Sequence, residues 1–255
     1  MDVLGAAAAV PDHVGIGVVI PYDFALDREL WRWVPTHVSL HLTRTPYQDI
    51  PVSLAQAMAV GDRATVARCT RDLLTVEPAA VAYGCTSGSF IRGLAGEAAL
   101  VAGMVEAGAP IAVTTSGAVT AAAHALGVKK MAVVTPYDEA VGAKLLAYLN
   151  EAGVEVTAHN DMGLTGRIWT VPYEVTADLT RRTAQGGGDA VFLSCTNLLT
   201  YDLIASLEQE LGVPVITANQ VTMWAILAAA GVAAVGPGQS LLERRPASLG
   251  SMRRV

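Results

Sequence analysis

The chain has 255 residues, of which 52% are hydrophobic and 16% charged, and its formal net charge at pH 7 is −6. No stretch approaches the roughly 18 uninterrupted apolar residues of a membrane-spanning helix, and no Lys/Arg cluster carries the interleaved aromatic residues of a nucleic-acid surface. We therefore expect neither a membrane nor a nucleic-acid partner. The first residues lack the basic segment and long apolar core of a signal peptide, so we expect a cytoplasmic protein with reduced thiols.

Apolar runs alternate with helix-period segments along the first half of the chain. Residues 14–20 form a continuous apolar run, typical of a strand inside a parallel sheet. Helical spacing is clearest over residues 53–76, before Glu77-Pro78. We expect strands at 14–20, 38–43, 79–83 and 110–114, and helices at 27–34, 53–76, 88–106 and 118–125.

The second half repeats this scheme. We expect strands at 131–135, 154–158, 190–194 and 214–217, and helices at 138–152, 173–185, 202–211 and 222–230. The regular alternation of strands and helices predicts an α/β fold with parallel sheets. Residues 236–255 are rich in Arg, Pro and Ser, and we expect them to form a mobile tail.

Three strand-and-turn units recur in the same order in both halves. Residues 81–87, an apolar run ending in Cys-Thr, match residues 191–197, which places the two cysteines 110 positions apart (195 − 85). Residues 18–23 match 133–138, and residues 111–116 match 213–218 more weakly. Such repetition indicates duplicated structural units. We predict two pseudo-symmetric lobes, at residues 14–117 and 118–235, each a parallel sheet flanked by helices, with the active site in the cleft between them.

The candidate catalytic residues are the two cysteines at the ends of the repeated strands. Ligands of open parallel sheets bind beyond the carboxyl ends of the strands, so Cys85 and Cys195 should face one shared cleft. A thiol just before a helix is expected to ionise more easily, because the helix N-terminus favours negative charge. Two opposed thiols suit either proton transfer across an acidic carbon or nucleophilic addition with the partner as the acid.

The candidate substrate-binding residues adjoin these cysteines or lie in the repeated Pro-Tyr-Asp turns. Hydroxyl, phenol and amide groups there could stabilise an anion that the thiols create. Cys69 lies inside a helix and has no counterpart, so we predict a structural role for it. No CxxC pair, His ligand spacing or nucleotide-binding GxGxxG motif occurs, and we predict neither a metal nor a cofactor. The substrate-binding candidates are Pro21, Tyr22, Asp23, Thr86, Ser87, Tyr137, Thr196 and Asn197.

Several motifs resemble the aspartate/glutamate racemase superfamily, and in detail its maleate cis-trans isomerase and arylmalonate decarboxylase branch. The resemblance is carried by GCTSGSF at 84–90, SGA at 116–118, VTPY at 134–137 and SCTNLLT at 194–200, and it covers about residues 14–235. The first motif also resembles ectoine-utilisation protein A-type members of the superfamily. The resemblance implies a cofactor-independent enzyme acting on a small carboxylate or dicarboxylate.

The number of cysteines separates the members of this branch. Arylmalonate decarboxylases keep only the second thiol and have glycine where Cys85 stands, whereas maleate isomerases and racemases keep both. The resemblance thus implies an isomerase, with maleate to fumarate as the reaction. Cys85 would add to the double bond, Cys195 would supply and reclaim the proton, and Tyr137 would hold a carboxylate. One position departs from the isomerase pattern, because Phe24 stands where those enzymes have asparagine.

Other functions stay open from the sequence. A racemase or decarboxylase would use the same thiols for proton transfer, and an anionic Asp23 would favour a substrate that bears an amine. A non-catalytic solute-binding module can also have two α/β lobes around a cleft. A homo-oligomer is compatible with all of these functions.

Overall fold

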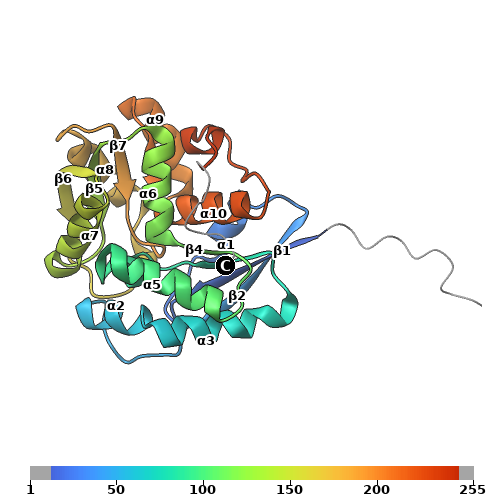
Figure 1. The fold of residues 1–255 in the computed structure, drawn as a ribbon. Helices are drawn as coiled ribbons and strands as arrows, with labels where there is room; N and C mark the ends of the chain where they lie inside the picture. The colour runs from blue at the N-terminus through green and yellow to red at the C-terminus, as the bar shows by residue number, and fades with distance from the viewer. Residues whose placement is uncertain (1–12, 247–255) are drawn as a thin grey trace, which may run out of the picture.

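The fold is built on two parallel sheets with the same strand order. The computed structural model describes residues 13–246, so residues 1–12 and the end of the predicted tail lie outside the described residues. The first sheet has the order β2-β1-β3-β4 and the second β6-β5-β7-β8, with parallel pairing throughout (Figure 1). The predicted two-lobed α/β fold is confirmed. The strands are β1 (Val14–Ile20), β2 (Val38–Arg44), β3 (Ala80–Tyr83), β4 (Ala112–Thr114), β5 (Lys130–Thr135), β6 (Glu155–Asp161), β7 (Ala190–Leu193) and β8 (Val215–Thr217).

In both halves, each strand is followed by at least one helix before the next strand begins. Several begin where a side chain accepts a hydrogen bond from a free backbone N–H group, as Asp138 does from Val141 at 2.9 Å. The α-helices are α1 (Asp27–Leu30), α2 (Leu54–Val60), α3 (Arg63–Leu73), α4 (Thr86–Phe90), α5 (Gly93–Glu106), α6 (Thr115–Leu126), α7 (Glu139–Glu151), α8 (Tyr173–Ala184), α9 (Ile204–Leu211) and α10 (Ala218–Ala229). The 3-10 helices are η1 (Trp31–Trp33), η2 (Leu74–Val76), η3 (Ile168–Thr170), η4 (Tyr201–Leu203) and η5 (Ser240–Glu243).

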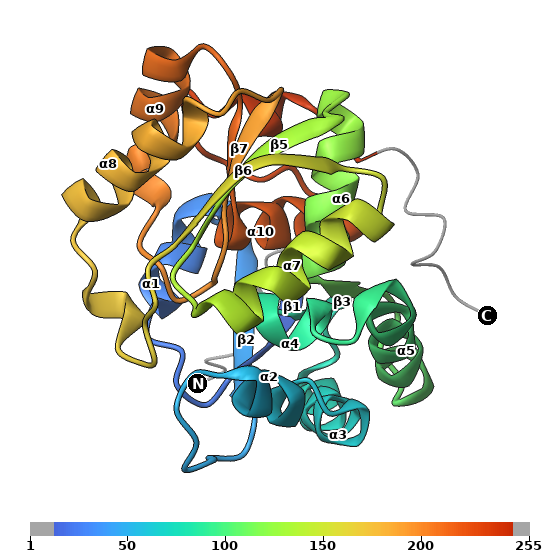
Figure 2. The same cartoon turned by 90° about the vertical axis from the view of Figure 1, so that its left-hand side faces the viewer.

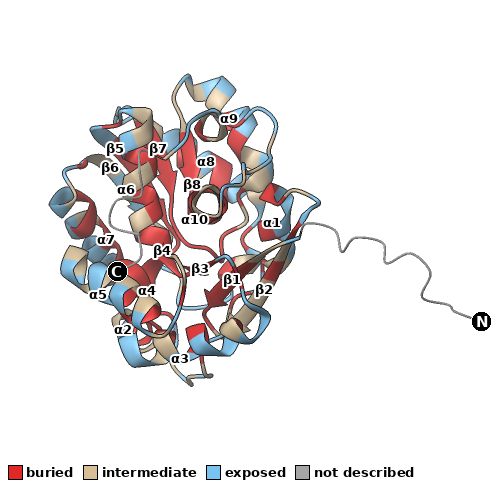
Figure 3. Ribbon diagram, turned by 45° about the vertical axis from the view of Figure 1, so that its right-hand side comes forward, coloured by how far each residue is buried: buried red, intermediate tan, exposed pale blue. Residues whose placement is uncertain are grey.

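Except at the edge strands β2 and β6, each sheet is buried on both faces, as the continuous apolar runs predict. Side chains alternate along β1, so Ile16 and Val18 join the central core, whereas Val19 packs toward α3 and α5. In the second lobe Val191 and Leu193 pack in the same way toward α8 and α9. α10 lies between the sheets, α3 lies outside the first sheet, and α8 and α9 lie outside the second (Figure 2). Buried residues accordingly concentrate on the strands and the inner helix faces (Figure 3).

The junction of the lobes is more continuous than the sequence predicts. The boundary expected between residues 117 and 118 falls inside α6, which follows β4 directly and packs against α10. Residues 236–246, the described part of the predicted tail, include side chains that pack against the rest of the protein. Gln239 is buried, and its Oε1 accepts hydrogen bonds from Trp33 Nε1 at 2.8 Å and from Gln220 Nε2 at 2.9 Å. Leu241 is fully buried as well.

Two predicted helices are each broken by a glycine. The helix expected over 53–76 divides at Gly61, where an added Cβ would lie 2.3 Å from the carbonyl oxygen of Gly88. The break therefore allows α4 to approach closely. The helix expected over 88–106 divides into α4 and α5 at Gly93, which has φ of 68°, a left-handed conformation that suits glycine. Glu151 of α7 then accepts a hydrogen bond from Leu94 N, at the start of α5.

Candidate active site

Both candidate thiols lie at the carboxyl ends of inner strands, in equivalent places of the two sheets. Cys85 follows β3 with an extended backbone (φ −144°) directly before α4, whereas Cys195 follows β7 with φ of 87°. A positive φ on a residue other than glycine is strained and is typically found at functional sites. Both cysteines are buried and line the same cavity.

This cavity gathers the predicted residues of both halves. It has a volume of about 20 Å³, which is room for roughly one water molecule, so little free space is left around its reactive groups. All the predicted catalytic and substrate-binding residues border it except Tyr22. The lining residues are Pro21, Asp23, Val52, Gln56, Cys85, Thr86, Ser87, Tyr137, Ile168, Cys195, Thr196 and Asn197.

Tyr22 is directed away from the cavity. Its hydroxyl donates a hydrogen bond to the Ile50 carbonyl oxygen at 3.0 Å, and its ring packs edge-on against Tyr47 with centroids 5.5 Å apart. Tyr22 therefore supports the loop between β2 and α2. Its counterpart Tyr137 is buried at the cavity, where its ring meets Phe90 edge-on at 6.2 Å.

Asn197 and Thr196 use their polar groups to join the lobes. Asn197 Oδ1 accepts a hydrogen bond from Ala25 N at 2.9 Å, and its Nδ2 donates to the Asp23 carbonyl oxygen at 2.9 Å. Thr196 Oγ1 donates to the Gly84 carbonyl oxygen at 3.3 Å. The loop that carries Cys195 is thus fastened to the first lobe, and one of the two N–H donors of the Asn197 amide is already used.

Other donors in the cavity remain available to a ligand. Thr86 Oγ1 is buried and has no hydrogen-bond partner among the described residues. Ser87 Oγ lies 3.8 Å from Cys85 Sγ. Because a buried hydroxyl without a partner is costly, Thr86 is the side chain best prepared to bind a substrate oxygen.

Burial controls the ionisation of the thiols. It raises the pKa of Cys85 above its ordinary value and raises the pKa of Cys195 to about 12. Backbone N–H groups oppose this effect, from Gly88 at Cys85 and from Asn197 at Cys195, where the N···Sγ distance is 3.4 Å. Burial thus opposes the easy ionisation that the sequence predicts. At Cys85 the loss of water outweighs the N-terminus of α4, and at Cys195 the next helical turn, η4, starts only at Tyr201.

A third ionisable group stands beside the thiols. Burial raises the pKa of the Asp23 carboxyl, although Arg44 partly offsets this effect. The Asp23 charge in turn raises the pKa of both cysteines. The lining of the cavity holds this carboxyl but no lysine or arginine.

Sequence reasoning missed three lining residues, Val52, Gln56 and Ile168. Val52 and Ile168 lie on the loops that follow β2 and β6, which meet where Val52 N donates to the Thr165 carbonyl oxygen at 2.9 Å. The segments after β2 and β6 occupy equivalent places in the two halves, so the internal repeat could have indicated that both border the site. Gln56 occupies the fourth place of a Ser-x-x-Gln helix start, in which Ser53 Oγ accepts from Gln56 N. That pattern locates the helix start but not the direction of its side chains.

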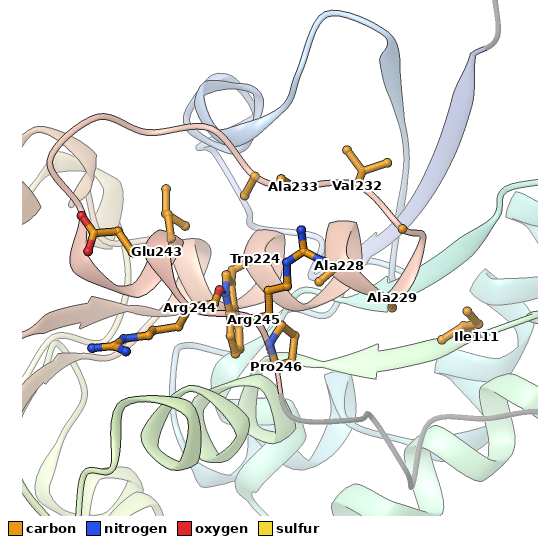
Figure 4. Close-up of a pocket in the computed structure, with 13 residues that line it drawn as sticks. Ile111, Trp224, Ala228, Ala229, Val232, Ala233, Glu243, Arg244, Arg245 and Pro246 are labelled. Atoms are coloured by element: carbon orange, nitrogen blue, oxygen red, sulfur yellow. The ribbon is translucent and has the colours of Figure 1, made fainter.

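A larger cavity lies away from the cysteines. It has a volume of about 460 Å³ and is formed by the C-terminal part of α10, the following loop and residues 242–246 (Figure 4). Trp224 and Arg245 border it, but no cysteine does. Within residues 13–246, no helix is long and apolar enough to cross a bilayer. The same residues contain no cluster of three His, Cys, Asp or Glu side chains suited to a metal ion.

The two sheets share one strand order, and a cysteine at the end of a strand from each sheet lines the same cavity. These features define a two-lobed α/β protein of the racemase type. The family model described as arylmalonate decarboxylase matches residues 58–242. The arylmalonate decarboxylase of Bordetella bronchiseptica is 37% identical over 162 residues, which are 62% of this chain and 68% of that protein. The maleate isomerase of Nocardia farcinica is 24% identical over 248 residues, which are 92% and 97% of the two chains.

A solved structure agrees with these sequence relatives. A liganded arylmalonate decarboxylase variant superposes with a TM-score of 0.82 at 30% sequence identity, over 89% of this chain and 98% of that one. The chain belongs to the arylmalonate decarboxylase family, in the branch of the aspartate/glutamate racemase superfamily that includes the maleate isomerases.

Proposed function

We propose that this protein is a cofactor-independent isomerase that uses Cys85 and Cys195 on a small carboxylate, with cis-trans isomerisation of maleate as the specific reaction. The observation that carries the proposal is the placement of one thiol from each half in the same small cavity. The similarity to maleate isomerase over nearly the whole chain supports it. A decarboxylase with glycine in place of Cys85 would need only the second thiol.

The two thiols can complete the reaction without a net change in atoms. Asp23, whose half-buried carboxyl has a raised pKa, takes the proton of Cys85. The Cys85 sulfur then bonds to one alkene carbon while Cys195 protonates the other, and the carbon–carbon bond between them becomes single and rotates. Cys195 takes the proton back, the carbon–sulfur bond breaks, the trans alkene forms, and Asp23 returns its proton to the Cys85 thiolate. Thr86 and Tyr137 would hold carboxylate oxygens during rotation.

Incubation with maleate under reducing conditions, followed by proton NMR, tests this function. We expect fumarate to accumulate, and we expect Cys85→Ala and Cys195→Ala each to lower turnover by about 100-fold or more. Cys69→Ala is the matched control, because Cys69 is buried in α3 and its thiol faces the Arg44 carbonyl oxygen at 3.6 Å. Absence of fumarate from a folded protein would exclude the maleate reaction.

Asp23 favours a second candidate, which is proton transfer at a carbon next to a carboxylate. A dianionic substrate would meet a cavity with a carboxyl group and no cationic side chain, whereas an ammonium group would pair with Asp23. Solvent deuterium appearing at that carbon without loss of CO₂ would identify a racemase. Release of CO₂ from an arylmalonate would identify a decarboxylase, and activity in none of these assays would favour a solute-binding module.

A further inference from the structure

A second buried phenol lies beside the first thiol and has no place in the mechanism above. Tyr83 is on β3, two residues before Cys85, and is fully buried. Its hydroxyl donates a hydrogen bond to the Val60 carbonyl oxygen at 2.8 Å, at the end of α2. A leucine, which has no polar group, would avoid the cost of burying this hydroxyl, and Leu193 occupies the matching place in the second lobe.

The glycine at position 88 makes room for this phenol next to the sulfur. A Cβ added to Gly88 would lie 2.1 Å from Tyr83 Oη and 3.2 Å from Cys85 Sγ. The phenol oxygen therefore occupies the space that a side chain at position 88 would need, and the thiol sulfur borders the same space. The presence of glycine here, at the first turn of α4, is explained by Tyr83 and not by a positive φ.

We propose that Tyr83 is a positioning residue for Cys85, whose hydroxyl moves its hydrogen bond from the Val60 carbonyl to the Cys85 sulfur when that thiol becomes a thiolate. The single hydroxyl proton of Tyr83 can serve either acceptor in turn. It is donated to the Val60 carbonyl oxygen while Cys85 is a thiol, and to the Cys85 sulfur once that sulfur is a thiolate. A hydrogen bond to a charged acceptor is about twice as strong as one between neutral groups, which drives the exchange.

The electrostatic surroundings of Cys85 agree with this role. Burial raises the pKa of Cys85, and the Asp23 charge adds to this effect, whereas the Gly88 N–H group, the nearby Tyr83 hydroxyl and Ser87 favour the thiolate and oppose it. Tyr137 and Cys195 face the same cavity from the second lobe. Burial keeps the pKa of Tyr83 well above its ordinary value, so its hydroxyl keeps its proton over the range in which the thiol titrates.

Titration of Cys85 alone tests the proposal without any substrate. In a chain carrying Cys69→Ala and Cys195→Ala, the thiolate of Cys85 is followed by its ultraviolet absorbance and by the rate of iodoacetamide labelling against pH. We expect Tyr83→Phe to raise the pKa of Cys85 by about one unit, which lowers the thiolate fraction at neutral pH about tenfold. Tyr148→Phe is the matched control, because Tyr148 is buried on α7 and its hydroxyl has no partner in the described part of the chain.

An unchanged pKa of Cys85 in folded Tyr83→Phe protein would overturn the proposal. Should that variant not fold, a ring-fluorinated tyrosine at position 83 keeps the shape while strengthening the donor; a lowered pKa of Cys85 would support the proposal and an unchanged one would refute it. Turnover depends additionally on the proposed role of Cys85. If the thiol shifts as expected but no substrate is converted, the proposed function fails while the role of Tyr83 stands.

Discussion

Replacement of Asn197 by alanine should loosen the junction between the lobes. The substitution removes two hydrogen bonds of 2.9 Å, to Ala25 N and to the Asp23 carbonyl oxygen. A typical intramolecular hydrogen bond contributes about 1 kcal/mol, and a buried group left unpaired costs about 1–3 kcal/mol. Ala25 is exposed and Asp23 half-buried, so water can reach the freed groups. We therefore expect the free energy of unfolding to fall by about 2 kcal/mol, which is about 1 kcal/mol for each of the two hydrogen bonds.

Urea unfolding measures this change directly, provided that the slope against urea concentration stays constant. Asn160→Ala is the matched control, because Asn160 makes one hydrogen bond, to Thr183 Oγ1, on an exposed strand end; we expect its effect to stay below about 0.5 kcal/mol. Asn197→Asp should be intermediate, since a carboxylate can still accept from Ala25 N but cannot donate to the Asp23 carbonyl. If Asn197→Ala matched the control, the inference that this amide fastens the two lobes would be refuted.

Three other predictions concern strain and buried ionisable groups. Cys195→Gly should be more stable than Cys195→Ala by about 1 kcal/mol, because φ of 87° is strained for alanine. At the extended position 85, Cys85→Ala should instead be more stable than Cys85→Gly. Thermal unfolding measures both differences, and a preference for alanine at both sites would contradict this reasoning. Burial raises the folded-state pKa of Glu29 above its ordinary value of 4.5, so the stability from this group is complete below that value and is lost as pH rises through the raised pKa. Glu29→Gln should remove this decline from urea unfolding measured over a pH series, and an unchanged decline would assign it to other groups. At neutral pH, iodoacetamide should label Cys195 far more slowly in the native protein than in the unfolded chain. A pKa of about 12 instead of 9.0 makes the thiolate fraction about a thousandfold lower. Equal labelling rates would show that water reaches the thiol in the native protein.

The sequence by itself determined the repeated architecture and the position of the two thiols. Continuous apolar runs predict buried parallel strands because both faces of such a sheet are covered. A repeat of Cys-Thr at matching strand ends then indicates one shared site, because parallel strands present their carboxyl ends at the same edge. These inferences need only local patterns and their order along the chain.

Only the tertiary structure decided how individual side chains are used. Tyr22 and Tyr137 occupy equivalent turns, yet Tyr22 supports a loop while Tyr137 faces the cavity. Asn197 carries donor groups suited to an anion, but the turn after β1 uses one of them and its amide oxygen. Such choices depend on which partner atom lies within about 3 Å, and for Asn197 those partners lie more than a hundred residues away in the chain.

The acidity of the thiols was also decided by packing. The N-terminus of a helix lowers the pKa of a neighbouring thiol, whereas removal of water raises it. Burial is the largest effect on the pKa of Cys85 and of Cys195. The role of Gly88 likewise depends on the ring of Tyr83, which fills the space that a side chain would need. The sequence thus shows which residues could react, whereas the tertiary structure decides their solvation, their partners and the space around them.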